Sequence, residues 1–303
     1  MRKNILTSTL IFGLIVLYSI PAMSQDLDAL LDKETTPQTT YATATFKATR
    51  IVNGHSVQQM KKKQLEFRVS HRFGQLNTGS YNFWGLDQGT IHLGLEYGIT
   101  DWLEVGIGRS TFEKTADAFT KISLLRQSSD ESFMPIHLSY MASTEVIGLN
   151  TDPAMQKNFT SRMSFVQQIL IARKFNENFS AQLTPTYIHR NLVPLEIDRN
   201  DLFAIGAGAR YKLSKRIAFN VEYYYVYRAN ENAASKSVPP PTKYYNPLSI
   251  GIDIETGGHV FQIMLTNSVA MREGGFIGKT TGSWTDAGIH LGFNISRVFS
   301  FNK

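Results

Sequence analysis

Histidines and glycine-rich turns are the features of this chain that could support metal or cofactor chemistry. The 303 residues include seven histidines and no cysteine. The histidine spacing does not match a metalloprotease helix, and a zinc site is not expected without cysteine. Gly106-Ile107-Gly108 and Gly206-Ala207-Gly208 lack the third glycine of a dinucleotide-binding turn, and no P-loop occurs. We therefore predict no metal, no cofactor and no catalytic residue.

Charged residues recur at alternate positions in several segments, so they share one polar face of an extended strand. Charges of both signs on such a face must pair with one another or stay hydrated if the face is enclosed. Two interpretations remain open: a ladder of ion pairs that stabilises a wall, or a narrow polar pathway for a small solute. The candidate residues of this face are Glu66, Arg68, Arg72, Glu96, Glu104, Lys121, Arg210, Lys212, Glu222 and Asp253.

The elements that must position these residues are strands with an apolar face opposite the polar one. In residues 91–99, one face holds Ile91, Leu93, Leu95, Tyr97 and Ile99, and the other holds His92, Gly94, Glu96 and Gly98. Runs such as 179–191 and 217–228 exceed the usual length of soluble strands and match tilted strands that cross a membrane. Residues 116–126 and 162–173 alternate poorly, so their strand limits are the least defined.

The connections between these segments are alternately short and long. Tight turns at 98–102, 175–179, 213–217 and 255–260 alternate with long loops such as 75–89, 229–244 and 272–285. This rhythm predicts an all-β fold, a transmembrane antiparallel β-barrel of about twelve strands over residues 64–301. We expect it in the outer membrane, surrounded by lipid, with short turns and both termini in the periplasm and longer loops outside. A soluble β-sandwich or lipocalin-like barrel is the alternative, since it also alternates.

The N-terminus predicts export. Arg2 and Lys3 precede an apolar run over residues 5–20 and a small-residue cleavage site at Ala22-Met23-Ser24, which is typical of a signal peptide over residues 1–24. The absence of cysteine excludes a lipoprotein anchor and a disulfide scaffold. The net charge of +6 falls to 6 − 2 = +4 without Arg2 and Lys3, and it is spread along the chain, so nucleic acid is not an expected partner.

Residues 25–63 precede the barrel and form a predicted periplasmic segment. Within them, residues 43–57 combine apolar side chains that need burial with cations that need acidic partners, and Asn53-Gly54 predicts a turn. We propose a plug in the periplasmic mouth; an added edge strand or a periplasmic hairpin is the alternative. The candidate plug residues are Phe46, Lys47, Arg50, Ile51, Asn53, Gly54 and His55.

Two stretches of this chain are similar to the opening of a known family. Residues 46–56 read FKATRIVNGHS and residues 65–74 read LEFRVSHRFG. They resemble a family of uncharacterised outer-membrane β-barrels, known only as a domain of unknown function. The resemblance implies a fold and a location across the mature chain, and it carries no catalytic residue. The last strand, with Phe299 and Phe301 near its end, also resembles the aromatic signal recognised by barrel assembly machinery.

The function that these features favour is a non-catalytic channel or transporter for a small solute. The runner-up is a structural barrel that holds a periplasmic protein partner through residues 25–63. A remote alternative is lipid hydrolysis, because His71, His189 and Asn267 fall on predicted lipid faces and a Ser/His/Asn or Ser/His/acid set cleaves esters. No serine suited to be the nucleophile adjoins either histidine on that face.

Overall fold

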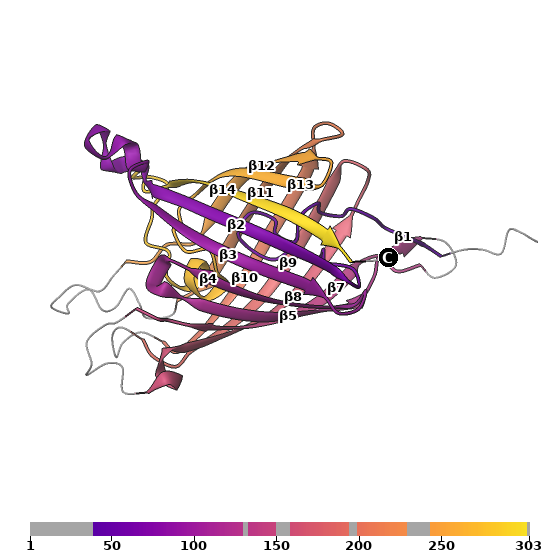
Figure 1. The fold of residues 1–303 in the computed structure, drawn as a ribbon, viewed down its shortest axis with the longest axis horizontal. Helices are drawn as coiled ribbons and strands as arrows, with labels where there is room; N and C mark the ends of the chain where they lie inside the picture. Colours follow the sequence, from indigo (N-terminus) through magenta and orange to yellow (C-terminus); the bar gives the residue numbers. More distant parts are fainter. Residues whose placement is uncertain (1–38, 130–132, 150–157, 194–198, 229–242, 302–303) are drawn as a thin grey trace, which may run out of the picture. The chain divides into compact units, whose positions relative to one another are not determined.

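Twelve strands of the described chain form a closed antiparallel barrel (Figure 1). The computed structural model describes residues 39–129, 133–149, 158–193, 199–228 and 243–301. The predicted signal peptide at 1–24 lies outside these residues. The barrel strands are β2 (Gln64–Gln75), β3 (Gly89–Gly98), β4 (Leu103–Ser110), β5 (Ala116–Leu125), β7 (His137–Val146), β8 (Met163–Lys174), β9 (Phe179–Arg190), β10 (Asp201–Lys212), β11 (Ile217–Tyr227), β12 (Leu248–Thr256), β13 (His259–Thr266) and β14 (His290–Ser300).

Each barrel strand pairs with its neighbour in the sequence, and β14 closes the sheet by pairing with β2 from Ser300↔Gln64 to His290↔Gln75. Closure leaves no strand edge with unpaired backbone groups, which is the requirement for a sheet in lipid. The prediction of a twelve-stranded antiparallel barrel is therefore confirmed. The two poorly alternating segments form β5 and β8, with limits within about one residue of those expected.

The connections separate the barrel into a tight-turn end and a long-loop end. The tight-turn end holds the β3–β4, β8–β9, β10–β11 and β12–β13 turns, and also a longer β5–β7 connection that contains β6 (Ser128–Ser129). The long-loop end holds η1 (Leu76–Thr78), η2 (Ser80–Gly85), η3 (Phe112–Lys114), η5 (Phe159–Arg162) and α3 (Glu273–Gly278). A two-residue strand, β1 (Thr40–Tyr41), precedes the barrel. Among the described residues, no helix is long and apolar enough to span a membrane.

The outer surface of the barrel is apolar along its strands. Leu93 on β3, Ile205 on β10 and Ile263 on β13 are 47%, 60% and 51% exposed, whereas the inward Glu96 and Asp253 are each only 2% exposed. An apolar outer belt around a closed barrel is stable when lipid replaces water at that surface. The alternation read from the sequence therefore assigned these faces correctly.

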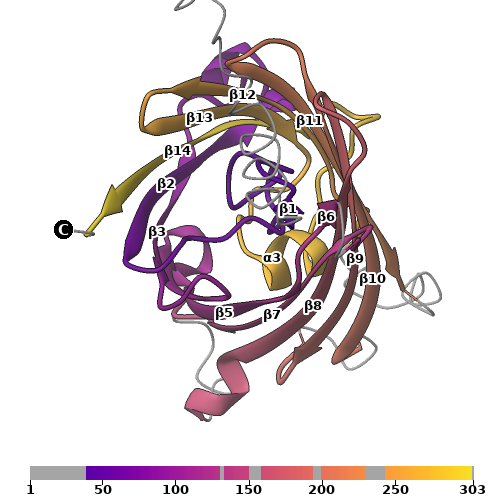
Figure 2. The same cartoon turned by 90° about the vertical axis from the view of Figure 1, so that its right-hand side faces the viewer.

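The interior of the barrel is filled by two inserts. Residues 45–57 enter from the tight-turn end, and α3 lies inside the wall near the other end; Figure 2, which looks along the barrel, shows both within the ring of strands. All six residues of α3 are buried. The prediction that residues 272–285 form an external loop was wrong for this helix, because Phe276 and Ile277 find an apolar cluster inside the barrel with Tyr224 and Leu202.

Candidate functional site

Residues 45–57, here called the lumen hairpin, form the centre of the site. Arg50 and His55 make an antiparallel bridge, and two backbone bonds frame it: Ile51 N to Gly54 O at 2.9 Å and Ser56 N to Thr49 O at 2.9 Å. The predicted turn at Asn53-Gly54 is therefore the hairpin tip. Because β14 pairs directly with β2, the segment adds no strand to the barrel.

Glu222 of β11 binds the tip through backbone amides. The N–H groups of Gly54, Asn53 and Val52 donate to the Glu222 carboxylate at 2.9, 3.3 and 3.4 Å. Charge-assisted bonds to backbone N–H are among the stronger hydrogen bonds in proteins. A Cβ at position 54 would collide with the Tyr224 hydroxyl, so only glycine fits this close approach.

Asn53 links the tip to β12, β13 and β2, which follow β11 along the same stretch of the barrel wall. Its Nδ2 donates to Ser249 Oγ at 2.8 Å and Thr266 Oγ1 at 3.2 Å, while its Oδ1 accepts from Arg72 Nη2 at 2.7 Å. Arg72 also donates to Asn294 Oδ1 at 3.1 Å. One amide side chain thus satisfies polar groups of several strands at once.

A buried charge cluster surrounds the base of the hairpin on β2 and β3. Arg50 of the hairpin pairs with Glu96 at 3.0 Å, and Arg68 pairs with Glu66 at 2.6 Å and with Glu96 at 3.2 Å. Thr49 Oγ1 lies 2.8 Å from Glu66 Oε2 and 2.9 Å from Glu96 Oε2, so its hydroxyl can donate to either carboxylate. Since all these groups are buried, removal of one partner would leave an unpaired charge in a poorly hydrated site.

Lys121, a predicted inward residue, and Glu255 contact the chain at the two ends of the hairpin. Lys121 pairs with Glu104 at 3.0 Å and donates to Gln58 O at 2.5 Å. Lys47, the exposed residue of the hairpin, pairs with Glu255 at 2.9 Å. Glu255 was not among the predicted inward residues, because the sequence placed it in a tight turn at 255–260, whereas the structure has it near the end of β12.

The remaining inward candidates belong to the wall. Arg210 donates to Glu255 Oε1 at 3.3 Å, and Asp253 accepts from Gln262 Nε2 at 2.8 Å. Gln262 Nε2 also donates to Ile51 O of the hairpin at 3.1 Å. Lys212 is only partly buried because it stands where β10 reaches its tight turn. It lines the mouth of the barrel instead of its interior.

A second buried cluster joins the hairpin to α3. Nε2 of His55 lies 3.7 Å from Oε1 of Glu273, a separation too long for a hydrogen bond. Arg272 pairs with Asp117 at 3.1 Å and with Glu273 at 3.5 Å. Glu145 Oε1 accepts from the Gly274 N–H at 2.8 Å.

The sequence prediction missed Asp117, Glu145, Arg272 and Glu273. Asp117 lies on the same face of β5 as Lys121, so alternation along the strand could have predicted it. The alternation in this segment is weak, and Asp117 was therefore missed. Arg272 and Glu273 lie in a loop, where no periodicity reveals which residues turn inward. Asp117 and Glu273 raise the pKa of Arg272 above its usual value although burial lowers it.

Burial lowers the pKa of His55 well below its usual range, and the neighbouring cations Arg50, Lys121 and Arg272 lower it further. His55 is therefore neutral near pH 7. Neither ring nitrogen has a hydrogen-bond partner among the residues that the structure describes, and the ring packs edge-on against Phe119 with centroids 4.5 Å apart.

The space between these groups is small. A cavity between the hairpin, β2, β3 and Arg272 measures about 10 Å³, and another between α3, β4 and β7 measures about 20 Å³. Such volumes hold about one water molecule each. In the described part of the chain, the hairpin and α3 leave little space at these two places.

The features considered for catalysis do not assemble into a site. His189 Nδ1 lies 2.7 Å from Asp201 Oδ1 on the outer face, but no contact in the described chain joins a serine to this pair. Asn267 was predicted to face lipid, and this was wrong: it is 2% exposed and donates inward to Gly282 O and Asn246 O. Within the described ranges, no group of three or more His, Asp or Glu side chains is arranged for a metal.

Comparison with known proteins identifies the barrel. The profile of a family described as membrane bound beta barrel domain (DUF5777) matches residues 46–299. No curated protein sequence matches significantly. Similar solved structures include the NanC porin (8% identity, TM-score 0.46, 79% of this chain and 100% of that one) and the KdgM porin (7%, 0.43, 79% and 99%). An outer membrane phospholipase A from Escherichia coli is also similar (11%, 0.40, 78% and 91%).

Proposed function

The chain belongs to the DUF5777 family of membrane-bound β-barrel domains, and on that basis we propose that it is an outer-membrane channel for a small polar solute. In this proposal the lumen hairpin is a plug that holds the channel closed. The tight-turn end and both termini face the periplasm, following the usual asymmetry of outer-membrane barrels. The barrel performs no covalent chemistry.

The polar wall behind the hairpin is the observation that carries this proposal. Buried inward residues include Ser180, Gln182, Asn220, Gln262 and Asn294. Two of these side chains bind the backbone of the hairpin. Gln182 Oε1 accepts from the Val57 N–H at 2.9 Å, and Asn294 Nδ2 donates to Val52 O at 3.1 Å. A barrel selected for stability alone would gain from apolar filling, because buried charges and amides are costly to desolvate. A polar wall is useful when the hairpin leaves and water replaces it.

The signs of the wall charges indicate the class of solute. With the hairpin displaced, the lumen would present Glu66, Glu96 and Glu104 beside Arg68 and Arg72. A wall with both signs close together does not select strongly for one ion charge. We therefore infer a small, hydrogen-bonding solute with little net charge.

A planar-bilayer experiment tests this function. Deletion of residues 43–57 should leave a heat-modifiable, folded barrel, because the strands pair without this segment, and it should raise single-channel conductance above that of the intact chain. An assembled deletion variant with unchanged conductance would contradict the plug and favour the structural barrel that holds a periplasmic partner. Conductance measured in KCl and in salts with a larger cation or a larger anion would show whether the channel selects only weakly between cations and anions.

A further inference from the structure

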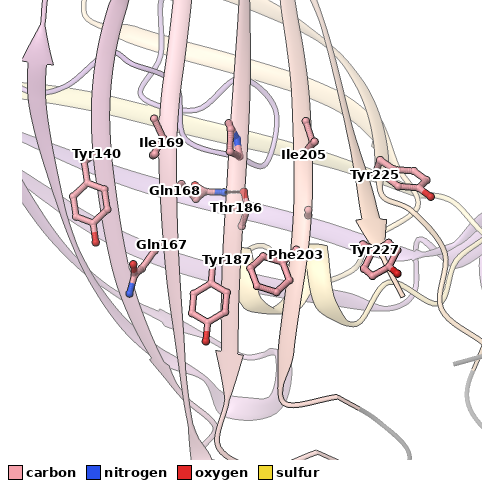
Figure 3. Close-up of a pocket in the computed structure, with 12 residues that line it drawn as sticks. Tyr140, Gln167, Gln168, Ile169, Thr186, Tyr187, Phe203, Ile205, Tyr225 and Tyr227 are labelled. Carbon is pink, nitrogen blue, oxygen red and sulfur yellow. Dashed lines mark hydrogen bonds between the residues drawn. The ribbon is translucent and has the colours of Figure 1, made fainter. Parts of the chain in front are cut away.

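A groove of about 590 Å³ lies on the outer face of the barrel, across β7 to β11. Figure 3 shows its side chains on adjacent strands, with Ile169, Phe203 and Ile205 around an apolar floor. Ligand pockets in proteins have volumes of about 300 to 1,000 Å³, so this groove is large enough for a bound molecule. It is separate from the filled lumen.

Pro185 explains why the wall is hollowed here. Its ring is shorter than the flanking Ile169 and Ile205, and the three residues line the same groove. Proline has no N–H to give to a sheet. The β8–β9 ladder accordingly runs to Gln168↔Thr186 and resumes only at Ile171↔Leu183, which skips the pairs at Pro185.

One end of the groove is polar. In Figure 3, the hydroxyl groups of Tyr140 and Tyr187 point in the direction of the β9 arrow, towards the long-loop end. Tyr187 Oη donates to Asp201 Oδ1 at 2.6 Å, and His189 Nδ1 lies 2.7 Å from the same oxygen. Both contacts use Oδ1, and the Asp201 side chain is 50% exposed, so its carboxylate is accessible to a ligand.

We propose that this groove binds one amphiphilic lipid, with an acyl chain over Pro185 and an amine-bearing head group at Asp201. The apolar floor lies on the membrane-facing side of spanning strands, where lipid is the surrounding solvent. The carboxylate supplies charge complementarity for an ammonium group, and the tyrosine hydroxyls lie at the same end for hydrogen bonds. An anionic head group would meet repulsion at that end.

Native mass spectrometry of the detergent-purified barrel tests the site, with phosphatidylethanolamine and phosphatidylglycerol of identical acyl chains as probes. The intact chain should retain one phosphatidylethanolamine more tightly than phosphatidylglycerol. Ile205→Trp, which fills the groove, should weaken that binding about tenfold or more. Leu93→Trp, at a similarly exposed lipid-facing site on β3, is the matched control and should bind like the intact chain.

Two further variants make the result decisive. Phe203→Ala removes part of the groove wall without added bulk, so a folding failure of Ile205→Trp would not end the test; it should also weaken binding. Asp201→Asn should keep the lipid but lose the preference between the two head groups. Equal binding by the intact chain, Ile205→Trp and Phe203→Ala would identify ordinary surrounding lipid and overturn the proposal. An intact chain that prefers phosphatidylglycerol would also overturn it.

Discussion

Single residues decide whether the lumen hairpin fits its site. The tip contacts the wall through Glu222, Asn53 and Arg72, and each contact joins groups far apart in the sequence. Gly54 shows how little space is left at the tip. A Cβ added at this position would collide with the Tyr224 hydroxyl and lie 3.1 Å from Glu222 Oε2. A cooperative set of this kind is sensitive to small changes in volume.

Gly54→Ala should weaken the seating of the hairpin by about 1 to 3 kcal/mol through overpacking. The measurement is trypsin cleavage after Arg50, which is 4% exposed and protected while the hairpin is bound. Gly257→Ala is the control, because a Cβ at that position meets nothing within 4 Å. Equal protection of Arg50 in both variants would show that the close approach at Gly54 does not hold the hairpin.

His55 should make the hairpin acid-sensitive. Burial, followed by nearby cations, lowers the pKa of His55 well below the ordinary 6.5. A group with a lowered folded pKa contributes stability above its unfolded pKa and loses it as pH falls from there towards the folded value. Trypsin cleavage after Arg50 should therefore increase as pH falls below 6.5. His55→Gln should flatten this part of the pH profile; an unchanged profile would assign the acid response to other groups.

At the scale of elements, strand alternation decides which face meets lipid. β3 places Leu93 outward at 47% exposure and Glu96 inward at 2%, and Ile99, directly after the strand, is 43% exposed. The pairing of β2 with β3 at Glu66↔Glu96 brings two inward carboxylates side by side, which explains the need for Arg50 and Arg68 between them. The paired strands place the two carboxylates, and Arg50 of the lumen hairpin supplies part of the positive charge that neutralises them.

Leu93→Arg should destabilise the assembled barrel by about 2 to 4 kcal/mol, because a charge near the middle of the lipid face is poorly solvated. Ile99→Arg, directly after β3 at the start of the tight turn, should cost about 0 to 1 kcal/mol because the arginine head group reaches the interface. Urea titration of the folded fraction in lipid vesicles measures both. Equal losses would indicate that the membrane boundary is not where the tight turns place it.

At the scale of the whole molecule, two inserts meet inside the barrel. The hairpin enters from the tight-turn end, α3 lies near the long-loop end, and His55 and Glu273 approach to 3.7 Å between them. Phe276 of α3 packs edge-on against Tyr224, the residue that also limits the hairpin tip, with ring centroids 5.3 Å apart. Movement of one insert therefore alters the surroundings of the other.

Removal of both inserts should open the barrel more than removal of the hairpin alone. A variant without residues 43–57, and with residues 270–279 replaced by a short glycine-serine linker, should give a higher single-channel conductance than the hairpin deletion. The replacement of residues 270–279 alone is the control and should give a small rise, because the hairpin still fills the lumen. If the double variant assembles and conducts no better than the intact chain, the channel proposal fails.

The sequence by itself predicted the strands and most of their faces, because a period of two is a local property of the chain, and the alternation of short and long connections predicted a barrel. It also placed nine of the ten inward charged candidates on buried positions, with Lys212 at the mouth. Only the tertiary structure decided that Arg50 meets Glu96, that Lys47 meets Glu255 and that α3 turns inward. Those contacts join segments that are far apart in the sequence, and the local pattern of side chains does not reveal which distant segments meet.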